Sequence, residues 1–185
     1  MGNAKESSLE ETLRAALKSQ YHAGLAMLRE SVEQCPEDEW TSADHVNAFW
    51  QVAYHAVFFA HFYLAPEEAA FRPWAQHQSN VQNPDGIAGP PDPESSLPLI
   101  PKPYSKSQVL AYCRHCEELI DGAVDALDLH SPSSGFSWYP ITKLEHQLVN
   151  LRHLGHHVGQ LADRVRSSTG VGTRWFGARP RSARD

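Results

Sequence analysis

Two histidines four residues apart, His153 and His157, are the residues of this chain best suited to chemistry. Residues at this spacing lie one above the other on one face of an α-helix, so both imidazoles can reach a single ion. Neutral imidazole is the commonest protein ligand for zinc, nickel, copper and ferrous iron. The pair alone is equally compatible with a solvated or packing role, and a metal site needs a third ligand from elsewhere in the chain.

A long helix is predicted to carry this pair. Thr142 and Glu145 form a capping box that predicts its start, and Gly170 is placed to end it near residues 168–170. Apolar residues recur beside the histidines at helical spacing: Leu144, Leu151, Leu154, Val158, Leu161 and Val165. The histidines therefore border a buried face.

Similar signals predict three further helices. A capping box at Ser8 predicts the start of the first helix, and Pro36 follows its end. Capping residues at 41–44 precede a second helix that is apolar nearly all round. Ser105 caps a third helix. The four predicted helices run over about residues 9–34, from the caps at 41–44 to 64, over 105–127 and from 142 to about 168. No strand pattern interrupts them, which predicts an all-α four-helix bundle with room for an extra short helix.

The segment 65–104 between the second and third helices contains nine of the 13 prolines. Proline removes a backbone donor and clashes within helices, so this segment is predicted to be an irregular insert over one end of the bundle. A chain of 185 residues fits a single domain, here expected over residues 1–170, followed by a polar tail at 171–185.

Composition argues against several classes of function. The formal net charge of −6 disfavours nucleic-acid binding, which needs a basic surface. No apolar run approaches the roughly 20 residues that cross a bilayer, and the first residues lack the apolar core of a signal peptide, so we expect a cytoplasmic protein without a membrane partner. Three cysteines suit a reducing compartment, and Cys113 and Cys116 are interpreted as packing residues.

The second predicted helix is the natural source of a third ligand, because bundle metal sites use inward side chains of facing helices. It contains His55 and His61, which point about 120° apart around a helix that turns about 100° per residue. Periodicity does not choose between them.

Two segments resemble the DinB-like (DinB/YfiT) metalloenzyme superfamily. They are the run from Trp50 to His55 and the run from Asn150 to Leu161, which includes the Gly159-Gln160 pair after the histidines. The resemblance extends helix by helix over about residues 9–168 and implies a DinB-like four-helix bundle. It implies His55, His153 and His157 as metal ligands and favours His157 over its neighbour His156.

The resemblance also implies a function. It indicates a divalent-metal-dependent hydrolase or a transferase that uses a low-molecular-weight thiol, acting on a small-molecule substrate and forming a homodimer. Zinc or nickel is the favoured ion, with iron or manganese as alternatives. The competing hypothesis is a non-enzymatic helical dimerisation module, metal-free or stabilised by metal. Around the ion, we expect polar contacts from Gln160, Asn150 and Arg164 and walls from Trp138 and Tyr139.

Overall fold

The computed structural model describes residues 2–79, 81–83 and 102–180, with side chains from residue 9 onward. Its helices are α1 (Gly2–Gln34), α2 (Glu37–Trp40), α3 (Phe49–Phe62), the 3₁₀ turn η1 (Glu68–Ala70), α4 (Lys106–Ala126) and α5 (Lys143–Thr169). Within these ranges the chain forms no strand. The predicted all-α bundle of four long helices with an additional short helix is confirmed.

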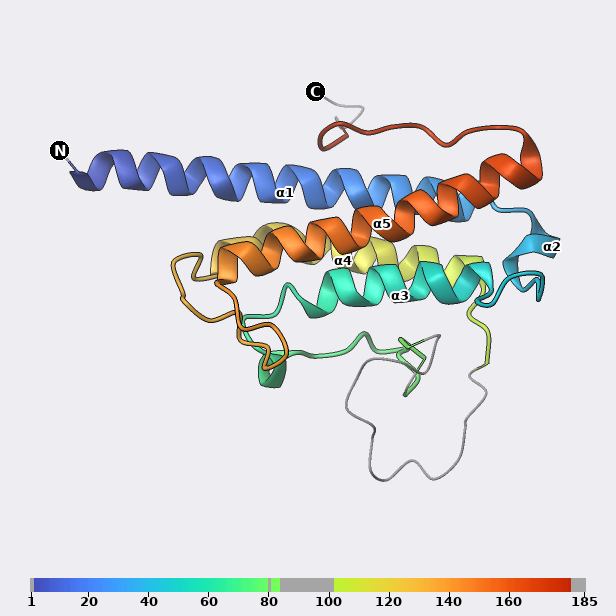
Figure 1. Cartoon of the computed structure of the whole chain (residues 1–185), viewed down its shortest axis with the longest axis horizontal. Coiled ribbons are helices and arrows are strands. Elements are labelled where there is room, and N and C mark those ends of the chain that lie inside the picture. Colours follow the sequence, from blue (N-terminus) through green and yellow to red (C-terminus); the bar gives the residue numbers. More distant parts are fainter. Residues whose placement is uncertain (1, 80, 84–101, 181–185) are drawn as a thin grey trace.

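The four long helices α1, α3, α4 and α5 lie side by side along the long axis of the molecule, with α2 at one end (Figure 1). Helix α5 packs against both α1 and α3, and α4 packs against the same two helices from the other side. Helix α3 is the most apolar element, and nine of its residues are buried. Burial of this helix among its neighbours contributes hydrophobic stabilisation to the bundle.

The caps of α4 and α5 are those predicted from sequence. The hydroxyl of Thr142 accepts a hydrogen bond from the backbone N–H of Glu145 at 3.2 Å, and Gly170 ends α5 with a φ of 73°. At the start of α4, Ser105 and Gln108 exchange hydrogen bonds between side chain and backbone, at 2.9 and 3.3 Å. These local contacts satisfy helix-end groups that would otherwise lack partners.

Two predicted helix starts are wrong. Helix α1 begins at Gly2 rather than near residue 9, and it includes Ala4, Lys5 and Glu6, three strong helix formers that precede the expected capping box. The second long helix begins at Phe49, after the predicted caps at 41–44. There the hydroxyl of Ser42 accepts from the N–H of Asp44 at 3.1 Å in a local turn, while the side chain of Gln51 caps α3 through the N–H of Ala48 at 2.8 Å.

The described part of the insert between α3 and α4 is irregular apart from η1, as predicted. Aromatic residues of the insert pack it against the bundle. The ring of Trp74 stacks on Tyr112 of α4 with centroids 4.7 Å apart. The hydroxyl of Tyr54 on α3 lies 2.6 Å from Nδ1 of His77. The central part of the predicted insert, residues 84–101, lies outside the described residues.

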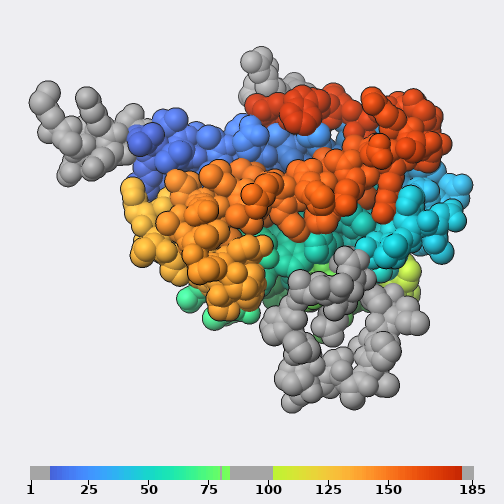
Figure 2. Space-filling model, viewed as in Figure 1, coloured from blue at the N-terminus to red at the C-terminus, as the bar shows by residue number. Residues whose placement is uncertain are grey.

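The segment after α5 turns back along α1 (Figures 1 and 2). The guanidinium of Arg174 pairs with Glu30 of α1 at 3.3 Å, and Arg179 pairs with Asp121 of α4 at 3.0 Å. The predicted polar tail is therefore attached to the bundle over its described part. None of the described helices is both long enough and apolar enough to cross a membrane.

Candidate metal centre

Three imidazoles meet between α3 and α5. The Nε2 atom of His153 lies 3.0 Å from Nε2 of His55 and 3.1 Å from Nε2 of His157. One nitrogen from each ring lies within 4.8 Å of the others, and no other group of three or more possible ligands is found in the described part of the chain. The structure thus brings together the three residues that the family resemblance implied.

The helices decide which histidines converge. His153 and His157 are one turn apart on α5, and α3 packs alongside α5 with His55 on the shared face. His61 lies on another face of α3, where its Nδ1 is 3.0 Å from the hydroxyl of Tyr112 on α4. His156 is exposed, with its ring centroid 5.0 Å from that of His157. The alternatives that periodicity left open are separated by helix packing.

Two of the rings are held through their second nitrogens. Nδ1 of His55 donates to the backbone carbonyl oxygen of Gln82 at 2.6 Å, and Nδ1 of His157 donates to the side-chain oxygen of Gln160 at 2.8 Å. Because both partners are acceptors, each Nδ1 carries the hydrogen and each Nε2 presents a lone pair to the cluster. The outer contacts that fix a metal-binding histidine usually have this arrangement.

The distances suit a bound divalent ion. An ion about 2.1 Å from two imidazole nitrogens holds those nitrogens about 3.0–3.4 Å apart for angles near 90–110°. Burial, with smaller contributions from His157 and His55, lowers the pKa of His153 to about 3, which keeps its ring neutral. Nδ1 of His153 is buried with no hydrogen-bond partner among the described residues. The lone pairs on Nε2 of His55 and His157 both face Nε2 of His153, and a cation among the three nitrogens would bind all of them, so the donor set fits a cation.

An aromatic ring covers one side of the cluster, and exposed residues of α5 flank it. The ring of Phe59 packs against His55 and His153, with centroids 4.7 and 5.4 Å away. On α5, the residues that follow the ligands around the helix are exposed: Gly155, His156, Gly159 and Gln160. The cluster therefore lies at the edge of the core, with its three histidines half-buried beside an exposed flank of α5.

Of the polar residues expected around the ion, only Gln160 contacts a ligand. Asn150 is fully buried and donates to the backbone oxygen of Ala60 at 3.2 Å, which makes it a link between α5 and α3. Arg164 donates to the backbone oxygen of Asn47 at 2.8 Å, in the segment before α3. Neither position could be distinguished by sequence spacing, because both share the histidine face of α5.

The aromatic walls expected from Trp138 and Tyr139 lie elsewhere. Trp138 stacks on Phe62 at 6.1 Å, and Tyr139 packs against Tyr63 at 5.7 Å, near the end of α3 away from the cluster. Phe59 provides the aromatic wall beside the histidines instead. Sequence analysis missed Phe59 as a wall although it lies one helical turn after His55, a spacing that signals contact.

The cysteines form no site. Cys113 and Cys116 are buried in α4 as free thiols, and burial raises the pKa of Cys113 to about 12. A protonated, enclosed thiol is a weak ligand and nucleophile. The interpretation of these two residues as packing residues is confirmed.

The fold and the cluster together define an all-helical bundle with a three-histidine group that could hold an ion. A sequence profile of the DinB superfamily matches residues 20–161, and the chain belongs to that superfamily. The matched range includes all three histidines of the cluster. Neither the curated proteins nor the solved structures include a significant match to the chain.

Proposed function

We propose that the protein is a divalent-metal-dependent enzyme of the DinB superfamily that acts on a small molecule. His55, His153 and His157 are the proposed ligands. The observation that carries the proposal is the convergence of three Nε2 atoms, two of which are aimed inward by carbonyl acceptors on their second nitrogens. A divalent cation would bind such a set of neutral imidazole donors.

A divalent ion with three imidazole ligands keeps open coordination positions and lowers the pKa of a bound water or thiol. The protein residues orient and shield this site. Gln82 and Gln160 hold two ligands in the required tautomer, while Phe59 excludes water from the buried side. The exposed flank of α5 beside Gln160 offers the route for substrate.

The proposed reaction is either hydrolysis or a group transfer that depends on a low-molecular-weight thiol. In both, a divalent ion held by the three histidines would lower the pKa of the attacking water or thiol, which would then need no protein carboxylate at the cluster as its base. This agrees with the cluster, which has no Asp or Glu member in the described part of the chain. An all-imidazole set favours zinc or nickel, with iron or manganese as the next candidates, over the oxygen-preferring magnesium and calcium.

Elemental analysis tests the metal site directly. Wild type, His153→Ala and His156→Ala would be purified without a metal-affinity step and analysed in parallel. His156→Ala is a matched control, because it removes an exposed imidazole from the same helix, three residues from His153. We expect about one equivalent of metal in wild type and the control, and its loss in His153→Ala. The ion identified then selects hydrolysis and thiol-transfer substrates for assay.

A different result would favour the competing hypothesis. If wild type takes up none of zinc, nickel, iron or manganese on reconstitution, the three histidines have a structural role and the chain is better regarded as a helical dimerisation module. Equal metal in all three proteins would place the ion elsewhere.

A further inference from the structure

A cavity lies on another side of α3 from the histidine cluster. It has a volume of about 790 Å³ and opens between the end of α3, the segment 64–75 and α4. Most of its lining is apolar, with walls from Leu64, Phe71, Trp74 and Leu119. Cavities of this size and character hold small molecules of several fused or linked rings.

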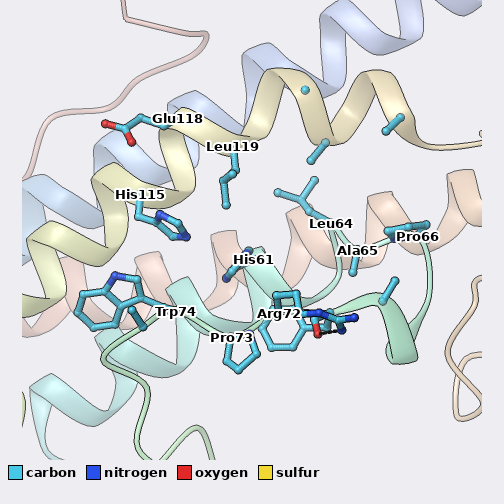
Figure 3. A pocket seen from close by; sticks show the side chains of 16 residues that line it. His61, Leu64, Ala65, Pro66, Arg72, Pro73, Trp74, His115, Glu118 and Leu119 are labelled. Atoms are coloured by element: carbon cyan, nitrogen blue, oxygen red, sulfur yellow. Dashed lines mark hydrogen bonds between the residues drawn. The ribbon is translucent and has the colours of Figure 1, made fainter.

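His61 is a half-buried polar group in the lining of this cavity. Figure 3 shows His61 of α3 and His115 of α4 facing the same space, with Trp74 beside them. The rings of His61 and His115 pack edge to face with centroids 5.5 Å apart. Burial and the neighbouring His115 lower the pKa of His61 to about 4, so it is neutral near pH 7.

The hydrogen-bond partner of His61 determines what it presents to a ligand. Tyr112 is fully buried, and its hydroxyl lies 3.0 Å from Nδ1 of His61. A buried hydroxyl donates where an acceptor is available, so Nδ1 is the acceptor and Nε2 carries the hydrogen. Nε2 of His61 has no hydrogen-bond partner within the described ranges, yet it is not buried. It is therefore accessible from the cavity that His61 lines.

The charged residues of the cavity are at its rim and have opposite signs. Arg72 and Glu118 are both exposed, and the carboxylate of Glu118 points away from His61 (Figure 3). Arg72 already donates to the backbone oxygens of Ala69 and Phe71, at 3.1 and 2.9 Å. The interior of the cavity therefore offers no net charge. An uncharged ligand pays the smallest desolvation free energy on entering such a site.

We propose that this cavity binds an uncharged aromatic carbonyl compound, with its rings against Phe71 and Trp74 and its carbonyl oxygen accepting from Nε2 of His61. The site is separate from the histidine cluster. His55 faces α5 and His61 faces α4, so a ligand here leaves the cluster accessible. The proposal stands or falls independently of metal binding.

Gly122 allows the cavity to be filled without disturbing the bundle. It lines the cavity from within α4, and a Cβ added there meets no atom within 4 Å. Leucine has a much higher helix propensity than glycine, so Gly122→Leu should occupy the cavity and leave the melting temperature unchanged or raised. Two variants serve as controls. Gly122→Ala raises the helix propensity but adds little volume to the cavity. Arg114→Leu adds an apolar side chain to an exposed position of the same helix outside the cavity.

The probe is 6-propionyl-2-(dimethylamino)naphthalene, an uncharged aromatic ketone whose fluorescence shifts to the blue in an apolar site. We expect saturable binding with one site per chain, weakened at least about tenfold in Gly122→Leu and changed by less than about twofold in Gly122→Ala and Arg114→Leu. The melting temperature of each variant shows that the fold is intact. No binding by wild type, or equal binding by Gly122→Leu, would overturn the proposal.

A second comparison tests the hydrogen bond from His61. The ketone-free 2-(dimethylamino)naphthalene should bind wild type about five- to tenfold more weakly, the usual effect of one hydrogen bond. In His61→Phe this preference should disappear, whatever the change in overall affinity. Equal affinities of both compounds for wild type would overturn the assigned ligand chemistry. So would tighter, Gly122-dependent binding of the anionic 8-anilinonaphthalene-1-sulfonate.

Discussion

The backbone carbonyl oxygen of Gln82 accepts a 2.6 Å hydrogen bond from Nδ1 of His55, across 27 residues of chain. The equivalent contact of His157 uses a side chain, the amide oxygen of Gln160 at 2.8 Å. Two of the three proposed ligands are therefore oriented by glutamines, one through its backbone and one through its side chain. Substitutions at these two positions should have different effects.

We expect Gln160→Ala to lower metal affinity by about 10- to 100-fold, because His157 loses the acceptor that fixes its tautomer. Gln82→Ala should retain the affinity of wild type, since the carbonyl oxygen remains in place. Competition with a chromophoric chelator measures both. Similar losses in the two variants would mean that the side chain of Gln82, whose Oε1 is buried and unpaired among the described residues, also acts on the site.

His146 should make the protein sensitive to acid. It is fully buried among the rings of Tyr63, Phe136 and Tyr139, and both of its nitrogens lack a partner in the described part of the chain. Burial, with a smaller effect of Lys143, lowers its pKa to about 4. Below the unfolded pKa of about 6.5, the unfolded chain binds a proton that the folded chain does not, so stability falls as the pH decreases from about 6.5 to 4.

The variant His146→Phe isolates this effect. It keeps an aromatic ring and removes two unpaired nitrogens, so we expect equal or greater stability at pH 7, by up to about 2 kcal/mol. Its loss of stability between pH 6.5 and 4 should be smaller than that of wild type by about 3 kcal/mol. Urea unfolding at several pH values measures both quantities. Identical pH profiles would show that His146 does not contribute to acid sensitivity.

Asn150 should matter for stability and not for metal binding. It lies on the histidine face of α5, and its amide donates to the backbone oxygen of Ala60 inside the bundle. Asn150→Ala should destabilise the protein by about 1–3 kcal/mol, as expected for a buried polar contact. The measurement is urea unfolding combined with elemental analysis. Loss of metal from a folded Asn150→Ala protein would show that Asn150 contributes to metal binding.

Two glycines inside helices should respond differently to alanine. A Cβ at Gly24 of α1 would lie 2.7 Å from Cδ2 of Leu154, which is buried on α5, whereas a Cβ at Gly122 meets open space. Gly122→Ala should stabilise the protein by up to about 1 kcal/mol through helix propensity. Gly24→Ala gains the same propensity but must displace a packed leucine, so it should be less stable than Gly122→Ala by about 1–3 kcal/mol. Thermal and urea unfolding of the two variants tests the order, which equal stabilities would contradict.

The sequence by itself determined the local features of this protein. Ser105 and Thr142 cap the helices they were predicted to cap, because a capping contact spans only three residues. The i, i+4 spacing of His153 and His157 likewise needs nothing beyond a helix. Ser42 and Asp44 show the limit of such signals: their side chains form a turn that competes with capping, and α3 begins later.

Only the tertiary structure decided which residues meet across the bundle. His55 and His61 belong to the same helix, and the packing of α3 between α5 and α4 directs one to the cluster and the other to Tyr112. The contact between His55 and the backbone carbonyl of Gln82 could not be predicted from residue types, because every residue has a backbone carbonyl. Contacts of this kind depend on how the helices rotate about their axes to bury the largest apolar area. That rotation is a property of the whole core and cannot be obtained from one segment.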